Sequence, residues 1–233
     1  MNEKPVCIIP ARGGSKRIPK KNIKLMNGKP LIAWSIETAL QSDIFSRVIV
    51  STDNEDISSV AQEYGANVPF MRDSELADDF ATTADVMHDA LNKLEKCSYA
   101  CCMYATAPMI QITDLIAAYE LLKQSKTDCV VSTTEFDFHP LRAFKQSPDG
   151  SIHFNWTEYE LTRSQDLPNL VHDAGAFYFF STDAFSKQKK MIMKNCLAYN
   201  IARSRALDID NQEDFDLVER LQSELLEKGL SDK

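Results

Sequence analysis

A glycine-rich, basic segment follows the first apolar run of the chain. Residues 6–9 are apolar, Gly13, Gly14 and Ser15 come next, and residues 12–24 carry six positive charges and no negative one. Glycine backbone N–H groups can approach phosphate oxygens closely, and Ser15 adds a hydroxyl donor. Arg12, Lys16 and Lys21 can supply positive charge around the phosphates, Arg12 with two-pronged geometry. The segment predicts a site for a compact polyanion such as a nucleoside triphosphate.

One alternative competes with a phosphate site in this segment. A Gly-Gly-Ser sequence is by itself more typical of a solvated turn. The Walker pattern and Gly-x-Gly-x-x-Gly are both absent, which disfavours the usual kinases and dinucleotide enzymes. Its position after the first strand favours a ligand site, because ligands gather at the carboxyl ends of parallel strands.

A pair of aspartates lies near the C-terminal end. In residues 206–210 polar and apolar side chains alternate, so Asp208 and Asp210 project from one face of an extended segment. Two carboxylates are a suitable ligand set for Mg²⁺ when substrate phosphates complete its coordination. The alternative is a helix start, because Asn211 is a natural N-cap with Asp214 three residues on.

The elements that would position these residues alternate along the chain. Strands are predicted at 6–9, 48–50, 99–104, 129–131, 174–180 and 205–210. Helices are predicted at 31–40 after an opening at 28–30, at 54–64, from residue 83, at 113–123 and around the apolar stripe Phe215, Val218, Leu221 and Leu225. The order predicts an α/β fold, a mostly parallel sheet with helices on both sides.

Residues 138–171 break this rhythm. Residues 142–146 and 151–155 flank Ser147-Pro148-Asp149-Gly150, which predicts a hairpin. An excursion of this kind from a doubly wound core indicates a lid or a subunit contact. The rest of the 233 residues is expected to form a single domain.

Composition excludes several classes of protein. A net charge of −8 argues against a general nucleic-acid binder, which needs a broad basic surface. The N-terminal apolar run is too short for a signal peptide or a membrane helix, so we expect no membrane partner and a cytoplasmic location. The six cysteines lack metal-ligand spacing and are expected to be reduced, mostly in the core.

The segment 9–22, Ile-Pro-Ala-Arg-Gly-Gly-Ser-Lys-Arg-Ile-Pro-Lys-Lys-Asn, followed by Gly28-Lys29-Pro30-Leu31-Ile32, resembles the signature of the CMP-sialic acid synthetase family. Asn22 fits the sialate branch better than the Kdo branch, where proline follows the lysine. The resemblance, which extends almost end to end, implies a Rossmann-like, GT-A-like nucleotidyltransferase sandwich, CTP as substrate, Mg²⁺ on Asp208 and Asp210, and a homodimer formed through residues 138–171. It implies catalytic roles for Arg12, Lys16, Lys21 and Asp210, and nucleotide contacts from Ala11, Arg12, Gly13, Gly14, Ser15, Asn22, Arg72, Asp79 and Thr83.

The acceptor side resembles the pseudaminic acid cytidylyltransferase branch. Neuraminate enzymes carry Gln-Pro-Thr-Ser-Pro where this chain has Tyr104-Ala105-Thr106-Ala107-Pro108, and a tyrosine gives a less polar wall than an amide. Pseudaminate has a methyl group and a second acylamino group where neuraminate has hydroxyls. The resemblance assigns sugar contacts to Tyr104, Thr106, Gln165, His172 and Asp173.

One of these positions has an alternative role, and a nearby residue departs from the branch. His172 beside Asp173 is a candidate base, but a histidine at the start of an aromatic strand is more typically a structural hydrogen-bonding group. Ala176 departs from the branch, which has glutamine after the glycine of His172-Asp173-Ala174-Gly175.

The implied reaction is attack of the anomeric hydroxyl of a nine-carbon nonulosonic acid on the α-phosphorus of CTP, with release of pyrophosphate. The general base stays open among an aspartate, a water molecule and a metal-bound hydroxide. Neuraminate or legionaminate is the alternative sugar. A nucleotide-sugar-dependent glycosyltransferase and a non-catalytic nucleotide-binding module are alternatives of other classes.

Overall fold

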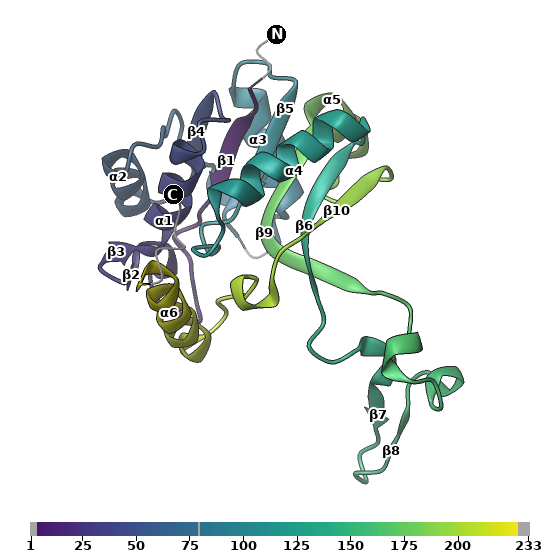
Figure 1. Cartoon of the computed structure of the whole chain (residues 1–233). Coiled ribbons are helices and arrows are strands. Elements are labelled where there is room, and N and C mark those ends of the chain that lie inside the picture. Colours follow the sequence, from purple (N-terminus) through teal and green to yellow (C-terminus); the bar gives the residue numbers. More distant parts are fainter. Residues whose placement is uncertain (1–3, 79, 228–233) are drawn as a thin grey trace.

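A six-stranded sheet forms the centre of the molecule (Figure 1). The computed structural model describes residues 4–78 and 80–227. In spatial order the strands are β10 (Cys196–Asn200), β6 (Cys129–Glu135), β9 (Val171–Ser181), β5 (Tyr99–Met103), β1 (Val6–Pro10) and β4 (Arg47–Ser51). Only β9 is antiparallel to its neighbours within this sheet. The carboxyl ends of the other five strands and the beginning of β9 therefore lie at the same edge.

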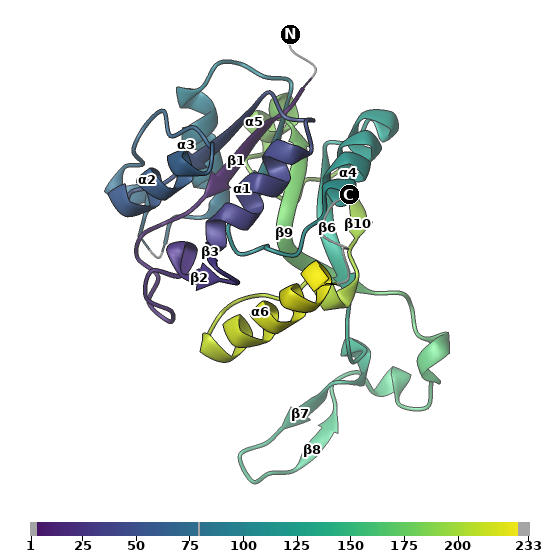
Figure 2. The same ribbon diagram turned by 60° about the vertical axis from the view of Figure 1, so that its left-hand side comes forward.

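Helices cover both faces of the sheet, as Figures 1 and 2 show. One face packs against α1 (Leu31–Gln41), α2 (Glu55–Glu63) and α4 (Ile112–Ser125), and the other against α3 (Thr83–Lys93) and α5 (Thr182–Gln188). Alternate strand residues supply the two cores: Cys7 and Ile9 point to the first, Val6 and Ile8 to the second. The mostly parallel α/β/α architecture predicted from the sequence is confirmed.

The last helix, α6 (Gln212–Glu227), packs on the segment that follows β1. Phe215 and Val218 are buried with Ile18 and Met26, and Leu221 and Leu225 complete the predicted apolar stripe. A short hairpin of β2 (Leu25–Met26) and β3 (Lys29–Pro30) precedes α1. Its turn residue Asn27 hydrogen-bonds Glu219, Gln222 and Ser223 of α6. The N-terminal and C-terminal segments are thus joined directly.

The strand predicted at 205–210 is wrong. Residues 203–205 form a short 3-10 helix, and residues 206–210 are extended but belong to no strand. The sixth strand of the sheet is instead β10, an edge strand that was not predicted and whose side chains are mostly exposed although residues 196–199 form a short apolar run. Residues 206–210 pair with side chains rather than with a neighbouring strand, because Lys21 Nζ donates to the Ile209 carbonyl oxygen and Asp214 accepts the Asp210 N–H.

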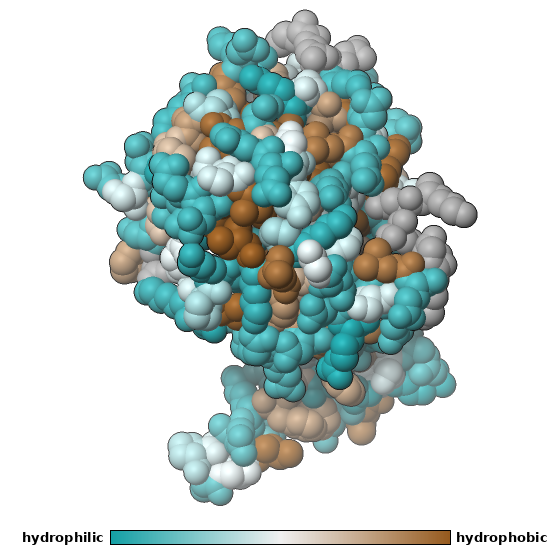
Figure 3. Space-filling model, turned by 90° about the vertical axis from the view of Figure 1, so that its left-hand side faces the viewer, coloured by the Kyte–Doolittle hydropathy of each residue, from teal (hydrophilic) through white to brown (hydrophobic). Residues whose placement is uncertain are grey.

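The predicted excursion extends away from the sheet (Figure 1). It holds the hairpin of β7 (Phe144–Gln146) and β8 (Ile152–Phe154), with short 3-10 helices at Pro140–Arg142, Thr157–Tyr159 and Ser164–Asp166. Phe138 and Leu161 are 89% and 95% exposed, and Phe144 and Ile152 are also exposed. Figure 3 shows apolar surface on this projecting part, below a body that is mostly hydrophilic from that side.

The cysteines agree with the sequence in the described part of the chain. Cys7, Cys101, Cys102 and Cys129 are buried, and all six are free thiols. Across residues 4–78 and 80–227, no helix combines the length and apolar character that a membrane crossing requires.

Candidate functional site

Two adjoining cavities lie at the carboxyl edge of the sheet. The larger, about 420 Å³, is bounded by the basic segment, the residues after β5 and the extended residues 206–210. The smaller, about 250 Å³, lies on the side of residues 72–83. Pro10, Arg12 and Tyr104 line both and form their common wall. The larger is lined by Pro10, Arg12, Ser15, Lys16, Arg17, Ile18, Lys21, Asn22, Tyr104, Ala105, Thr106 and Asp210.

The glycine turn after β1 is fixed by residues after β4. The Gly13 N–H donates to Asp53 Oδ1 at 2.9 Å, and a methyl group on Gly13 would lie 2.8 Å from Asn54 Cβ. Asn54 cannot move away without cost, because its side chain caps α2 by accepting the Ile57 N–H. Asn22, itself buried, holds the other end of the segment by donating to the Arg12 carbonyl oxygen at 3.0 Å. Only glycine fits at position 13.

The basic segment is also joined to the predicted metal ligands. Lys21 Nζ donates to the Ile209 carbonyl oxygen at 2.7 Å, and Arg17 pairs with Asp210 at 2.7 Å. Burial lowers the pKa of Lys21, while Asp208 and Asp210 oppose that shift. Both carboxylates therefore act on the same ammonium group from residues 206–210.

The aspartates flank a buried residue, as the alternation predicted. Ile209 is fully buried, whereas Asp208 is exposed and Asp210 partly exposed. The helix-start alternative is also present in the structure: Asn211 Oδ1 accepts the Asp214 N–H, and Asp214 Oδ2 accepts the N–H groups of Asp210 and Asn211. Asp214, and not Asp208 or Asp210, therefore caps the start of α6. Asp210 pairs with Arg17, and both Asp208 and Asp210 lie close enough to Lys21 to affect its pKa.

Arg72 is a buried cation in the smaller cavity. It is only 6% exposed, and its Nε and one terminal nitrogen lack a hydrogen-bond partner. Asp53 lies 3.5 Å from that nitrogen, close enough for charge attraction but too far for a good hydrogen bond. Burial lowers the pKa of Arg72, and Asp53 opposes the shift. Unsatisfied buried donors are costly, so this geometry favours an anionic ligand that completes the site.

Four aromatic and polar side chains are linked beside the two cavities. The hydroxyl groups of Tyr104 and Thr83 lie 2.8 Å apart, and the Tyr104 ring packs edge-on against Tyr178. Tyr178 donates to Asp173 Oδ2 at 2.5 Å. Burial raises the pKa of Tyr104 to about 12 and also raises that of Tyr178. Both phenols are therefore neutral at physiological pH, and Tyr104 presents an aromatic ring with one uncharged hydroxyl group to the cavities.

The remaining predicted residues fall in three places. Ala11 is buried under the glycine turn, and Gly14 borders it without lining either cavity. Gln165 lies in the excursion, and His172 packs its ring on Phe136 at the start of β9; neither lines the two cavities. Asp79 lies outside the described residues. The roles of these residues, like those of the other predicted site residues, stay predictions.

Asp53, Arg17 and Tyr178 belong to the site but were not among the predicted residues. Asp53 follows the end of β4, and its position next to a parallel strand's carboxyl end could have identified it. In the sequence, Arg17 is one of the six positive charges of residues 12–24, and nothing else distinguishes it. Tyr178 lies within an apolar strand whose neighbours are core residues, so nothing in its local sequence distinguishes it.

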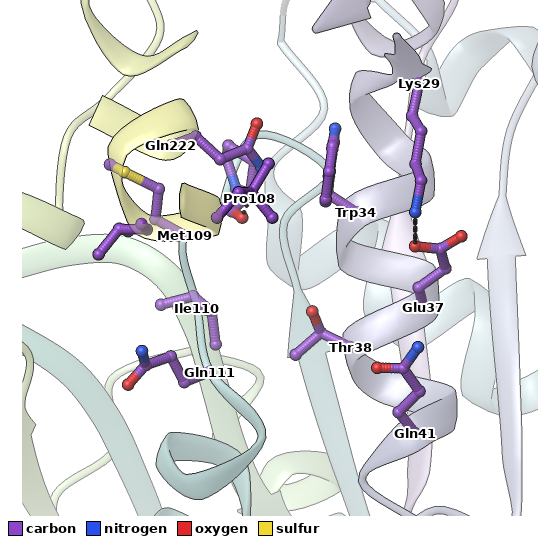
Figure 4. Close-up of a pocket in the computed structure, with 12 residues that line it drawn as sticks. Lys29, Trp34, Glu37, Thr38, Gln41, Pro108, Met109, Ile110, Gln111 and Gln222 are labelled. Atoms are coloured by element: carbon purple, nitrogen blue, oxygen red, sulfur yellow. Dashed lines mark hydrogen bonds and ion pairs between the residues drawn. The ribbon is translucent and has the colours of Figure 1, made fainter. Parts of the chain in front are cut away.

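A further cavity of about 460 Å³ lies behind the residues that follow β5 (Figure 4). Trp34 and Thr38 of α1 face Pro108, Met109 and Ile110 across it, and Lys29 pairs with Glu37 at 2.6 Å. Its walls mix apolar side chains with uncharged polar ones, and its two charged residues, Lys29 and Glu37, neutralise each other. The charged cavities in front of Tyr104 therefore fit a polyanion better than this one.

Comparison with known proteins gives a consistent result. A family model described as cytidylyltransferase matches residues 6–231. The chain is 40% identical over 222 residues to the pseudaminic acid cytidylyltransferase of Campylobacter jejuni (strain 81-176), covering 94% of this chain and 96% of that protein. It is 33% identical to the N-acylneuraminate cytidylyltransferase of Streptococcus agalactiae serotype V, covering 91% of this chain and 52% of that protein.

A solved structure shares the fold. It is a CMP:2-keto-3-deoxy-manno-octonic acid synthetase complexed with CTP, with a TM-score of 0.74 at 19% identity. The alignment covers 95% of this chain and 99% of that one, so the nucleotidyltransferase architecture extends over nearly all of the chain.

The contact between Gly13 and Asn54 generates a prediction about stability. Replacing Gly13 with alanine forces a methyl group against Asn54, so we expect the free energy of unfolding to fall by about 1–3 kcal/mol. Gly14→Ala is the matched control, because its methyl group would meet no atom within 4 Å. We expect its free energy of unfolding to stay within about 0.5 kcal/mol of that of the native protein. Urea denaturation measures both, and equal losses would contradict the packing argument.

Proposed function

The chain belongs to the cytidylyltransferase family, and we propose that it transfers CMP from CTP to the anomeric hydroxyl of a nonulosonic acid, pseudaminic acid before others. The chain is a nucleotidyltransferase. The observation that carries the proposal is the cavity in which Arg12, Lys16 and Lys21 face Asp210 across a space of about 420 Å³. It combines cations for a triphosphate with a carboxylate for a bridging cation.

The proposed reaction is an in-line displacement at phosphorus. The anomeric oxygen forms a bond to the α-phosphorus, the bond to the oxygen bridging to the β-phosphorus breaks, and the hydroxyl proton is released. Arg12, Lys16 and Lys21 would hold the triphosphate and stabilise the charge that develops on the leaving pyrophosphate. The Ser15 hydroxyl would contribute an uncharged donor to the same phosphates. The backbone N–H of Gly13 already donates to Asp53 and that of Ser15 to the Gly13 carbonyl oxygen, so the predicted backbone contacts would need these bonds to be exchanged on binding.

The donor set of residues 206–210 fits Mg²⁺. Asp208 and Asp210 supply hard oxygen ligands on the same side of the extended segment, and two protein carboxylates suffice when substrate phosphates provide the rest. Within the described residues no group of three or more His, Cys, Asp or Glu side chains could hold a metal ion. When bound, Mg²⁺ would neutralise charge on the α-phosphate and the leaving pyrophosphate.

The two cavities support a proposed placement of the nucleotide and of the sugar acid. We place the triphosphate in the larger cavity with Asn22 and Ser15 and, near the common wall, Arg72 and Thr83 as further nucleotide contacts. We place the sugar acid against Tyr104 and Thr106. Asp173 is linked to Tyr104 through Tyr178, which packs against the Tyr104 ring and donates a hydrogen bond to Asp173. The neutral phenol of Tyr104 suits a deoxygenated, acylated sugar better than a fully hydroxylated one.

The excursion is proposed as the contact of a homodimer. Its exposed apolar side chains, including Phe138 and Leu161, have no partner surface among the described residues of the same chain that would bury them. Such side chains mark protein–protein contacts when they gather on one projecting element. We keep a cytoplasmic location as part of the proposal, because the reaction needs a supply of CTP.

A substrate panel tests the reaction and the sugar. We expect pyrophosphate release from CTP with pseudaminic acid to exceed that with N-acetylneuraminic or legionaminic acid by about 10-fold or more in kcat/KM. Preference for either of the other acids would replace the sugar assignment. No pyrophosphate with any of them, together with consumption of a nucleotide sugar, would indicate a glycosyltransferase. Nucleotide binding without turnover would indicate a binding module.

The metal assignment predicts a large effect of one substitution. Asp210→Asn removes a negative ligand while keeping the shape, so we expect Mg²⁺-dependent pyrophosphate release to fall by about 100-fold or more. The matched control is Asp216→Asn, an exposed aspartate on the outer face of α6, which should retain activity. Unchanged turnover in Asp210→Asn would refute the metal role.

The dimer proposal predicts a change in sedimentation. The native protein at micromolar concentration should sediment as a dimer, and the double variant Phe138→Ser, Leu161→Ser should sediment as a monomer. Ile192→Ser, which replaces a 56% exposed apolar residue on the body of the molecule, is the control and should leave the dimer intact. Sedimentation of the native protein as a monomer would contradict the proposal.

A further inference from the structure

We propose that Arg205 and Asp114 form a clamp that positions residues 206–210, which carry Asp208 and the cavity-lining Asp210. Neither residue lines the cavity, so both are positioning residues rather than catalytic ones. The inference rests on the proposed function, because it gives these residues a part in presenting the carboxylates to a cation and a nucleotide.

The contact between the two side chains is two-pronged and nearly buried. One terminal nitrogen of Arg205 donates to Asp114 Oδ2, and the other donates to Asp114 Oδ1 at 3.1 Å. The side chains are 14% and 5% exposed. The first nitrogen also donates to the Met109 carbonyl oxygen at 3.3 Å. Arg205 therefore holds both α4 and the segment between β5 and α4.

Asp114 is itself held in one orientation. Its Oδ2 accepts the Gln111 N–H at 2.9 Å as part of a capping box at the start of α4. Its Oδ1 accepts the Tyr199 hydroxyl of β10 at 3.2 Å. Burial beside this carboxylate raises the pKa of Tyr199 to about 12, so the phenol remains a donor. The anchor for Arg205 is therefore rigid.

The clamp connects the two sides of the cavity through short pieces of chain. On one side, Met109 follows closely after Tyr104 and Thr106, which line the cavity. On the other side, Arg205 ends the 3-10 helix directly before residues 206–210, and Lys21 fixes the far end of that segment at Ile209. With both ends fixed, the position of Asp208 between them depends on Arg205.

A second contact, from α6, fixes the segment between β5 and α4. Gln222 of α6 is 2% exposed, and its side-chain nitrogen donates to the Pro108 carbonyl oxygen at 3.1 Å (Figure 4). The residues between Thr106 and Gln111 are thereby held by α6 on one side and by Arg205 on the other. Movement of residues 206–210 relative to Tyr104 would have to break the Arg205 contacts.

Lysine cannot replace Arg205 in this arrangement. A lysine keeps the positive charge but offers one compact ammonium group, which cannot reach both carboxylate oxygens and the Met109 carbonyl in the same planar geometry. Substituting Arg205→Lys therefore tests geometry while leaving the net charge unchanged. Arg203→Lys is the matched control: Arg203 lies in the same 3-10 helix but pairs with Asp137 at 2.9 Å on the surface, where the side chains are 52% and 75% exposed.

The test measures CTP binding by calorimetry without sugar acid, in the presence and in the absence of Mg²⁺. We expect Arg205→Lys to reduce the Mg²⁺-dependent gain in CTP affinity by about 10-fold, while CTP affinity without Mg²⁺ changes little, because residues that orient metal ligands have effects of this size. In the presence of Mg²⁺ and a sugar acid, kcat should fall more than the KM for the sugar rises. Arg203→Lys should match the native protein in each measurement.

Thermal unfolding of each variant separates positioning from simple stability. A lower midpoint in Arg205→Lys with an unchanged Mg²⁺-dependent gain would overturn the proposal and leave a purely structural ion pair. If Arg205→Lys does not fold, Tyr199→Phe removes one of the hydrogen bonds that orient Asp114. Its Mg²⁺-dependent gain should fall about 2–3-fold, the lower end of the contribution of a single hydrogen bond; a native value there would overturn the proposal. Absence of any Mg²⁺-dependent CTP binding in the native protein would instead refute the proposed function itself.

Discussion

The hydrogen bond from Lys21 Nζ to the Ile209 carbonyl oxygen joins residues 188 positions apart, and the charged cavity exists because of it. The glycine turn and basic segment follow the first strand, whereas the aspartates lie beyond the last. Neither segment belongs to the sheet, so the sheet alone does not bring them together. Lys21, the Arg17–Asp210 pair and the contacts of Asn27 with α6 do so. The C-terminal helix is therefore part of the site's construction rather than an appendage.

The antiparallel strand β9 has a related role. A fully parallel sheet would begin β9 at the amino edge, far from the carboxyl ends of β1 and β5. Because β9 runs the other way, its first residues, including Asp173, lie at the same edge as Tyr104. The strand also continues directly from the excursion, which projects from that edge (Figure 1). The reversed direction of β9 therefore places Asp173 beside Tyr104 and also places the proposed dimer contact at the same edge of the sheet.

The sequence predicted the parts of the site whose chemistry is local. Glycine and basic residues after an apolar strand indicated phosphate binding, and the alternation around Ile209 placed Asp208 and Asp210 on one side although the strand itself was wrong. Alternation reports which side chains face the solvent, and an extended segment pinned by Lys21 alternates as a strand does. Asp53 and Tyr178 could not be recognised in the same way, because their roles arise from neighbours distant in sequence. β10 was missed because its short continuous apolar run, residues 196–199, has no periodicity that identifies a strand.

Besides the proposed metal binding, the carboxylates around the cavities reduce the repulsion between neighbouring cations. Several cations concentrated around one cavity repel one another, and an acidic protein with a net charge of −8 must still hold them at one place. Asp210 beside Arg17 and Asp53 beside Arg72 relieve that repulsion without filling the donors completely. Arg72 retains two buried nitrogens without hydrogen-bond partners, an arrangement that costs stability in the free protein. A polyanion that supplied the missing acceptors would offset that cost on binding, which supports the proposed nucleotide contact of Arg72.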